Sequence, residues 1–140
     1  MIQKDITALT NRLMDNMDAE AIQLLVENQP DQAIDETKVW TRWIVNPNFD
    51  ETYTLGPNPI YKQRGTATLQ IFIPKGLYTG PGNDIRDQFN ALFRGWRSAD
   101  KKVVVENLKS TSSTYKRGDQ EFHLINATAF WHSNRKTTDQ

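Results

Sequence analysis

The clearest pattern of apolar and polar positions in this chain spans Arg64–Trp96, where the spacing of a strand is followed by that of a helix. From Thr66 to Ile73 an apolar side chain recurs at every second position, which is the period of a strand. Pro74, Gly76, Gly80, Pro81 and Gly82 then interrupt regular structure. The pattern becomes helical from Asp84, where one apolar stripe is formed by Ile85, Phe89, Leu92, Phe93 and Trp96. We therefore expect a central strand, a glycine-rich connection and an amphipathic helix, capped by Asn83 or Asp84.

The rest of the chain predicts one more helix and four more strands. The residues from Ala21 to Asn28 are compatible with a helix or a strand. We favour a strand, which ends before Pro30. The polar stretch Lys109–Gln120 is expected to be a turn. The predicted helix is Gln3–Met17, and the predicted strands are Ala21–Asn28, Val39–Val45, Lys102–Leu108 and Glu121–Trp131. The order α-β-β-β-α-β-β indicates an α+β fold, with a single mixed β-sheet of four to five strands and two helices packed on one face.

Composition places few limits on function. The 140 residues suit one domain, expected over residues 1–132 with a flexible polar tail at 133–140. Seventeen basic and 17 acidic residues give no net charge, which argues against general nucleic-acid binding. There is no cysteine, no apolar run near the roughly 20 residues of a membrane span, and no signal-like start. We expect a protein of the cytoplasm that does not contact membranes.

The segment Asn46–Gln63 combines prolines with an excess of apolar and aromatic side chains. A structureless connection of this length is unusual in a compact domain and is commonly functional. The segment could become ordered against a partner, or it could be an extended hairpin that projects from the domain. Both alternatives predict protein–protein contact through Phe49, Tyr53, Leu55, Ile60 and Tyr61.

No motif in the chain predicts catalysis, a cofactor or a metal. The glycine loop lacks the Gly-Lys-Ser/Thr ending of a phosphate-binding loop, because Asn83 and Asp84 follow Gly82. His123 and His132 lie nine residues apart on one predicted strand, so they point to opposite faces and cannot share a metal. Acidic pairs at helical spacing are explained by solvated helix surfaces. We expect a protein that is not an enzyme.

A nucleic-acid-binding sheet would need aromatic side chains among basic ones on one face. The residues that could be assembled in this way are Trp40, Arg42, Phe72, Phe122 and Trp131. The zero net charge, and the need to cover the sheet, make a core or an interface the favoured interpretation of these side chains. A sheet-based RNA-binding module is therefore retained only as an alternative.

The order of several short motifs resembles that of the tail-terminator proteins of long-tailed bacteriophages, of the minor tail protein U type. The resemblance covers about Ile6 to Trp131, and its motifs follow a short first helix. They are Val26-Glu27-Asn28-Gln29-Pro30, Trp40-Thr41-Arg42, Gln63-Arg64-Gly65, Gly80-Pro-Gly82 and the Ile85…Phe89 helix, before a closing pair of strands.

This resemblance implies a virion protein of the tail neck, assembled in the host cytoplasm. It would form a homo-hexameric ring on the last ring of tail-tube protein, stop tube polymerisation and present a surface to a head-completion or connector protein, with DNA only passing through. A ring closed by head-to-tail contacts needs two different patches on each protomer. We expect one in the Asn46–Gln63 segment with Arg64, and the other in the connection Lys75–Pro81, with Lys75 and Tyr78. Another head–tail connector protein is the closest alternative.

Overall fold

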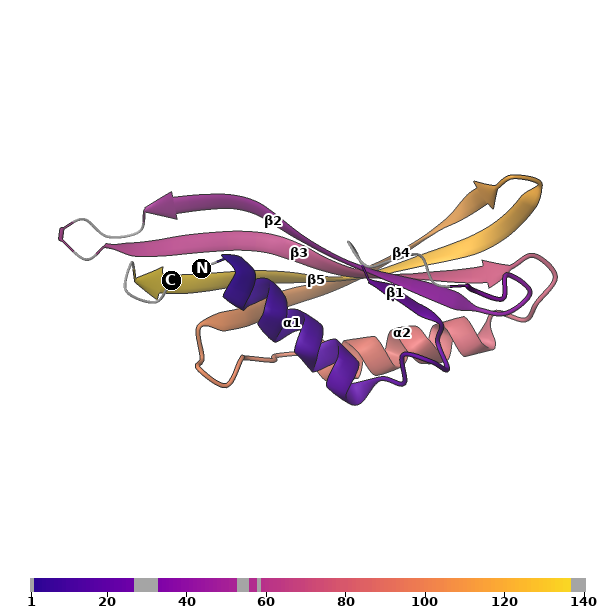
Figure 1. The fold of residues 1–140 in the computed structure, drawn as a ribbon, viewed down its shortest axis with the longest axis horizontal. Coiled ribbons are helices and arrows are strands. Elements are labelled where there is room, and N and C mark those ends of the chain that lie inside the picture. Colours follow the sequence, from indigo (N-terminus) through magenta and orange to yellow (C-terminus); the bar gives the residue numbers. More distant parts are fainter. Residues whose placement is uncertain (1, 27–32, 53–55, 58, 137–140) are drawn as a thin grey trace.

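The structure, a computed structural model, describes residues 2–26, 33–52, 56–57 and 59–136 and contains two helices and one five-stranded sheet. In chain order the elements are α1 (Ile2–Asn16), β1 (Leu24–Val26), β2 (Trp40–Thr52), β3 (Ile60–Pro74), α2 (Gly80–Phe93), β4 (Val103–Arg117) and β5 (Gln120–Lys136). The strand order is β1-β2-β3-β5-β4, with β1 parallel to β2 and the other neighbours antiparallel. Both helices lie on the same side of the sheet (Figure 1). The predicted α+β class and element order are confirmed.

The main core lies between the two helices and the sheet face that they cover. Leu9 and Leu13 of α1 and Phe89 and Phe93 of α2 are fully buried against that face, as their helical spacing predicted. Trp43 of β2 stacks on Phe93 with ring centroids 5.9 Å apart. Since burial of one large apolar side chain contributes about 1.5–3 kcal/mol, these stripes attach both helices to the sheet.

Helix α2 begins and ends earlier than the apolar stripe indicated. It starts at Gly80 with Thr79 as N-cap, so the expected cap at Asn83 or Asp84 is wrong. A proline is tolerated in the first turn because the N–H that it lacks has no partner inside the helix. Gly82 is buried where α2 approaches β3, and a Cβ there would lie 2.3 Å from Ile73 Cδ1. The helix ends at Phe93, and Gly95 follows with a φ of 65°.

In the segment Asn46–Gln63, the residues up to Thr52 and from Ile60 onward belong to the antiparallel strands β2 and β3, which agrees with the second of the two predicted alternatives, an extended hairpin. Gly65 of β3 allows Trp131 of β5 and the backbone of Asn46 in β2 to approach it from its two neighbours. A Cβ at this position would lie 2.4 Å from the Asn46 carbonyl oxygen and 2.7 Å from the Trp131 ring. The register of β3 with β2 and β5 at this point therefore requires glycine at position 65, which has no side chain.

The last hairpin is much longer than predicted. The polar stretch Lys109–Gln120 is strand up to Arg117, and the turn is limited to Gly118 and Asp119. The predicted flexible tail is also wrong for 133–136, which continue β5, while 137–140 lie outside the described residues. Both segments are polar although they form strands. The residues of β4 are polar because they face water, and Arg135 of β5 is charged because it forms a buried ion pair.

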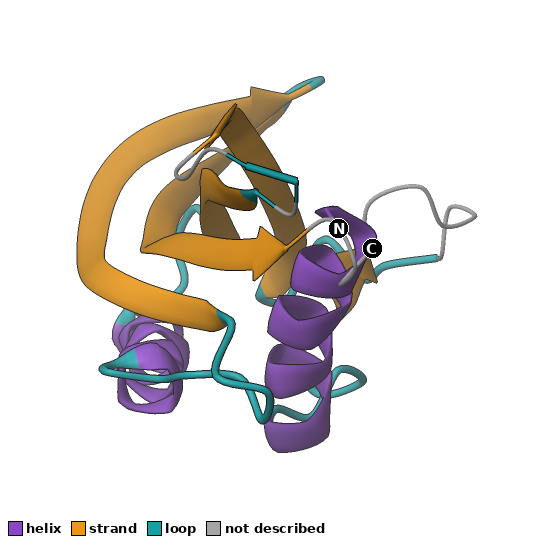
Figure 2. Cartoon of the chain, turned by 90° about the vertical axis from the view of Figure 1, so that its left-hand side faces the viewer, coloured by secondary structure: helices purple, strands orange, loops and turns teal. Residues whose placement is uncertain are grey.

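A second apolar cluster lies on the sheet face that the helices do not cover. Trp40, Phe72, Phe122 and Leu124 are its buried members, with Trp40 stacked on Phe72 at 3.9 Å between ring centroids. Tyr115 of β4 packs beside Phe72 at 5.0 Å. The strong bend of the sheet, visible in Figure 2, accompanies this cluster at the end where β4 turns into β5.

Replacement of Gly65 tests the close approach of the three central strands. Gly65→Ala should lower the free energy of unfolding by about 1–3 kcal/mol, because the added methyl group meets a backbone oxygen and a buried ring. Urea denaturation followed by tryptophan fluorescence measures the change. Gly80→Ala is the matched control, since its methyl group meets only the exposed Tyr78 ring, which can turn away. Equal stability of the two variants would contradict the register described above.

Candidate interaction surfaces and a buried charge network

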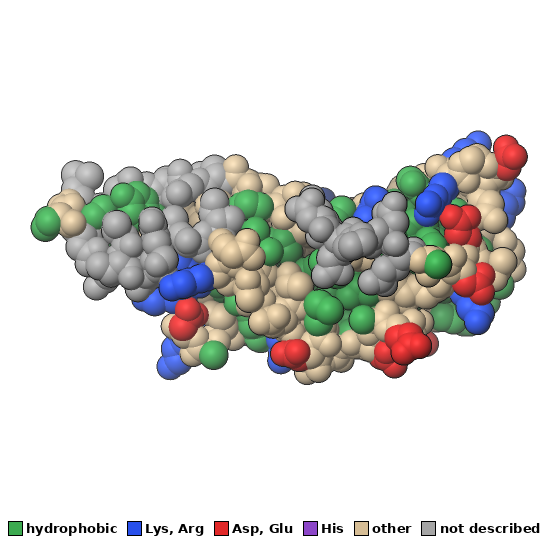
Figure 3. All heavy atoms as spheres, in the orientation of Figure 1, with side chains coloured by type: hydrophobic (Ala, Val, Ile, Leu, Met, Phe, Trp, Pro, Cys, Tyr) green, Lys and Arg blue, Asp and Glu red, His purple; other side chains and the backbone are tan. Residues whose placement is uncertain are grey.

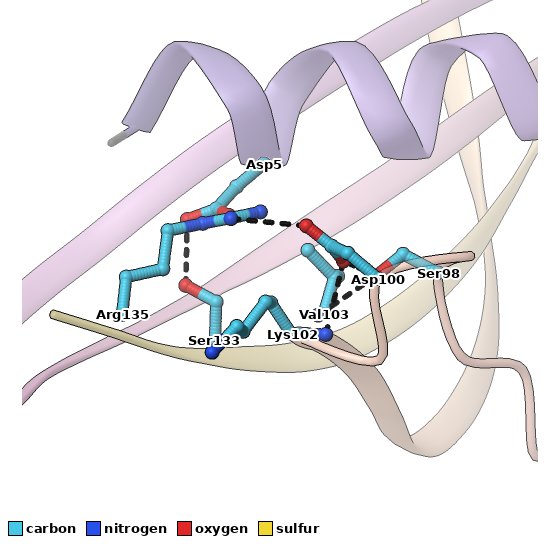
Figure 4. Close-up of polar contacts among 7 residues, drawn as sticks. All are labelled: Asp5, Ser98, Asp100, Lys102, Val103, Ser133 and Arg135. Atoms are coloured by element: carbon cyan, nitrogen blue, oxygen red, sulfur yellow. Dashed lines mark hydrogen bonds and ion pairs between the residues drawn. The ribbon is translucent and has the colours of Figure 1, made fainter. Parts of the chain in front are cut away.

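A buried charge network ties the start of α1 to the end of β5. Arg135 Nε donates to Asp5 Oδ1 at 2.7 Å, and Ser133 Oγ donates to Asp5 Oδ2 at 2.6 Å. Asp5 is completely buried and Arg135 is 3% exposed. Arg135 Nη1 also donates to Asp100 Oδ2 at 3.1 Å, which brings in the loop between α2 and β4 (Figure 4). Three segments far apart in the sequence thus meet at one guanidinium.

Asp100 organises the loop on its side of the network. Its Oδ1 accepts hydrogen bonds from Ser98 Oγ at 2.5 Å and from the backbone N–H of Lys102 at 3.0 Å. Burial raises the pKa of Asp100, but these bonds and the Arg135 charge outweigh burial and lower the pKa to about 2. Burial lowers the pKa of Arg135, and its bonds to Asp5 and Asp100 outweigh this effect and raise it.

This network is a structural attachment and not an acid–base site. An open groove of about 500 Å³ lies beside it, lined in part by Lys4, Asp100 and Arg135. Both Asp5 oxygens and both Asp100 oxygens already accept hydrogen bonds from the protein. An acid–base pair needs carboxyl groups whose pKa values are moved apart toward the working pH, whereas the pKa of Asp100 moves away from neutrality.

The two histidines occupy separate surroundings. His123 is exposed on the face that carries the helices, and His132 lies on the opposite face, where its Nδ1 pairs with Glu106 of β4. Within the described residues, no group of three or more His, Asp or Glu side chains could hold a metal ion.

The first predicted surface lies on the β2–β3 hairpin. Phe49 and Arg64 are directly paired across the two strands, and Ile60 and Tyr61 open β3 with half-buried side chains. Arg64 is also half-buried and interacts within the chain. Tyr53 and Leu55 lie outside the described residues. The hairpin therefore brings four of its six predicted residues into one neighbourhood.

The second predicted surface is the connection between β3 and α2. Tyr78 is 82% exposed and its neighbour Leu77, which sequence reasoning missed, is 47% exposed. Lys75 is exposed and its Nζ lies 3.5 Å from Glu121 Oε2. Open grooves of about 440 and 290 Å³ flank the connection. Figure 3 shows charged side chains of both signs at this end of the molecule, and Leu77 lines the larger groove together with Lys75, Asp119 and Glu121.

The uncovered sheet face carries a band of hydrogen-bonded polar side chains. Thr68 and Thr128 Oγ1 atoms are 3.1 Å apart, and Gln70 Nε2 donates to Asn126 Oδ1 at 3.2 Å. Arg42 Nε donates to Gln70 Oε1 at 2.8 Å. The aromatic residues of this face do not offer rings to a base, because Trp40, Phe72 and Phe122 are buried in the second cluster. Trp131, also considered for nucleic-acid stacking, is buried in the main core.

Comparison with known proteins defines the fold. No protein-family model and no curated protein matches this chain. Eight chains of solved structures do match. One of them aligns over 94% of this chain and 94% of its own length, with a TM-score of 0.67 and 18% sequence identity, and its name states no activity, ligand or partner. At this identity the similarity concerns the fold. Among the described residues, no helix is long and apolar enough to cross a membrane.

The Asp100 contacts predict how stability changes in acid. The folded pKa is about 2 and the ordinary value is 3.8, so Asp100 stabilises the fold above about pH 4, and this contribution is lost as the pH falls toward 2. Asp100→Asn should therefore flatten the fall in unfolding free energy between pH 4 and pH 2, measured by urea denaturation. Asp119→Asn, at the exposed turn of the other end of β5, serves as control. An unchanged slope in Asp100→Asn would contradict the proposed role.

Proposed function

We propose that this chain is a bacteriophage tail terminator, a structural protein that forms a ring on the last ring of the tail tube. In this role it stops tube polymerisation and offers the surface to which the head is joined. The proposal draws on the order of motifs along the chain and on an α+β fold of the expected element order. It would place the protein in the neck of the virion, after assembly in the host cytoplasm.

The observation that carries the proposal is the separation of two candidate contact surfaces along β3. The 15 residues of β3 span roughly 50 Å, with Ile60 and Tyr61 at one end and Lys75 and Tyr78 just beyond the other. Ring closure by head-to-tail contacts requires two different and complementary patches on each protomer. Patches at opposite ends of an elongated protomer suit such contacts, because one end can meet the other end of the next copy.

The chemistry of the second surface also supports a contact role. Three large apolar side chains are exposed among the described residues, and two of them, Leu77 and Tyr78, are adjacent in the β3–α2 connection. Single exposed apolar residues are normal, whereas an adjacent pair with a charged rim is typical of a contact site. Tyrosine is enriched among residues that dominate binding energy, so we assign Tyr78 the central position in this contact.

A terminator of this kind acts by covering and not by chemistry. Its ring binds the growing edge of the tube and offers tube protein no further equivalent surface. The opposite surface would be left for a head-completion or connector protein, and DNA would pass through the opening. The closest alternative, a connector protein of the neck, shares this lack of chemistry but binds the head side and not the tube end.

Electron microscopy with purified tail-tube protein separates the two functions. The terminator hypothesis predicts rings of this protein at tube ends and tubes that stop growing when it is added. Rings that bind only head particles would favour the connector alternative. Native mass spectrometry gives the number of copies in the ring, for which we expect six. A protein that remains monomeric at all concentrations, also beside tube protein, would contradict both proposals.

The role of Tyr78 can be tested without disturbing the core. Tyr78→Ala should leave the melting temperature within about 2 °C, since surface substitutions usually change stability by less than about 0.5 kcal/mol. It should weaken ring formation at least tenfold in native mass spectrometry, because truncation of a central contact residue costs about 2 kcal/mol or more.

Gly80→Ala provides a second and independent perturbation of the Tyr78 side chain. The added methyl group would lie 2.1 Å from Tyr78 Cε1 and must turn the ring away from its position over the start of α2. We expect weaker assembly with an intact fold. Met14→Ala is the matched control, because Met14 is also a large apolar residue exposed on the described surface and lies on α1. Equal assembly by all three variants and the wild type would remove Tyr78 from the interface.

A further inference from the structure

The outer edge of β4 is closed by the chain itself only over its first residues. The backbone N–H of Val105 donates to the Trp96 carbonyl at 3.0 Å, and the N–H of Ser98 donates to the Val103 carbonyl at 3.0 Å. A bulge follows between Val105 and Asn107. Among the described residues, no backbone group pairs with the outer edge of β4 from Asn107 to Arg117.

The register shows which backbone groups of β4 point outward. Arg117 pairs with Gln120 across a two-residue turn, and the pairing continues without a shift back to Asn107. The residues that close such a turn exchange hydrogen bonds with each other, and the bonded positions then alternate. The outward N–H and C=O groups therefore belong to Leu108, Ser110, Ser112, Thr114 and Lys116. The Leu108 N–H agrees with this assignment, because it is accepted by the side chain of Asn107 at 2.9 Å.

The two outer edges of the sheet differ in how they are protected from pairing with another chain. Beside β2 lies the short strand β1, and β2 also contains Pro47 and a bulge between Pro47 and Phe49. Prolines and bulges are common means of preventing an edge strand from pairing with another chain. After its own bulge, β4 has no proline and no further bulge over eleven residues, so its basic side chains are its protection against pairing with a like-charged strand. These residues are rich in serine and threonine and are exposed on both faces up to Thr114, apart from half-buried Leu108.

The charge of this edge restricts its partner. Between Asn107 and Arg117 the strand carries Lys109, Lys116 and Arg117 and no acidic residue. Arg117 pairs with Glu36, which lies between β1 and β2, and Lys116 lies opposite Glu121 of β5. A second copy of β4 would bring an equally basic strand alongside. An edge strand with this charge is complementary to an acidic one.

We propose that the outer edge of β4, from Leu108 to Lys116, is a β-augmentation site for an acidic, extended segment of another protein. The segment would add a sixth strand to the sheet beside β4. Main-chain hydrogen bonds to the outward positions would supply affinity, and Lys109 and Lys116, on opposite faces of the strand, would select acidic side chains. This inference concerns a different surface from the ring contacts and does not depend on the tail function.

A proline substitution tests the role of the outward backbone groups without disturbing the rest of the fold. Ser112→Pro removes an outward N–H and leaves the hydrogen bonds between β4 and β5 in place, which is the setting in which strands tolerate proline. Ser112→Ala is the matched control, since it also removes the hydroxyl but keeps the N–H. If Ser112→Pro lowers the melting temperature by more than a few degrees, Ser110→Pro, on the same side of the ladder, replaces it.

The probe is a fluorescein-labelled twelve-residue peptide of repeated Thr-Thr-Glu-Glu, which presents glutamate on both faces of a strand. Its counterpart contains lysine in place of glutamate. Fluorescence anisotropy should show that the acidic peptide binds the wild type and Ser112→Ala equally, and Ser112→Pro at least tenfold more weakly. The lysine peptide should bind at least tenfold more weakly than the acidic one, and higher salt should weaken binding of the acidic peptide.

Three outcomes would overturn the proposal. They are no binding of the acidic peptide to the wild type, equal binding by Ser112→Pro, and a wild-type dimer in analytical ultracentrifugation that Ser112→Pro converts to monomer. The last outcome would assign the edge to a second copy of the chain. Ring formation by Ser112→Pro beside tube protein is measured in parallel, so that failure of the edge site and failure of the tail function are distinguished.

Discussion

The pairing of β3 with β5 is the interaction on which the rest of this structure depends. Every residue of β3, from Ile60 to Pro74, has a partner on β5. Because two antiparallel strands of this length form a ribbon that holds their ends far apart, the long strands β2 and β4 on either side can pair along them. The close approach at Gly65 keeps the ribbon in register, because Trp131 and the Asn46 backbone occupy the space that a side chain would need.

The helices and the charge network act on this ribbon at different points. The apolar stripes of α1 and α2 cover the middle of one face, whereas Asp5 reaches the end of β5 and holds Arg135. Burying an ion pair is costly, and the pair gives little net stability compared with an apolar contact of equal volume. Its specific effect is orientation, since the pair is satisfied only when α1, β5 and the loop at Asp100 meet in one arrangement.

The sequence predicted the elements whose apolar residues recur at a regular period. The first helix, with Leu9 and Leu13 at helical spacing, and the alternation from Thr66 to Ile73 were placed correctly because one face of each element is buried. The β4 stretch from Lys109 to Thr114 was not predicted as strand, since both of its faces meet water and it has no apolar period. Its threonines favour strands, but hydrogen bonding to β5 decides the structure there.

The candidate surfaces were predictable to different degrees, because some leave a local signal in the sequence and others depend on residues far apart in the chain. An exposed aromatic residue in a glycine-rich connection, such as Tyr78, is recognisable in the sequence because nothing in a turn requires it. Arg135 and Ser133 looked like part of a polar tail, since their partner Asp5 lies at the opposite end of the chain. The β4 edge leaves no local signal, because an edge exists only once the strand order is known.

The groups available to a partner lie at the periphery of the sheet, whereas the bonded polar groups described above lie inside it. Both carboxylate oxygens of the buried Asp5 accept hydrogen bonds from the protein, and the Gln70 and Asn126 side chains bond to each other. The groups left for a partner lie at the periphery: the apolar pair at Leu77 and Tyr78, and the outward backbone groups of β4. A catalytic site concentrates strained or perturbed groups in one sheltered place. The proposed contacts of this chain are instead distributed over one end and one edge of the sheet.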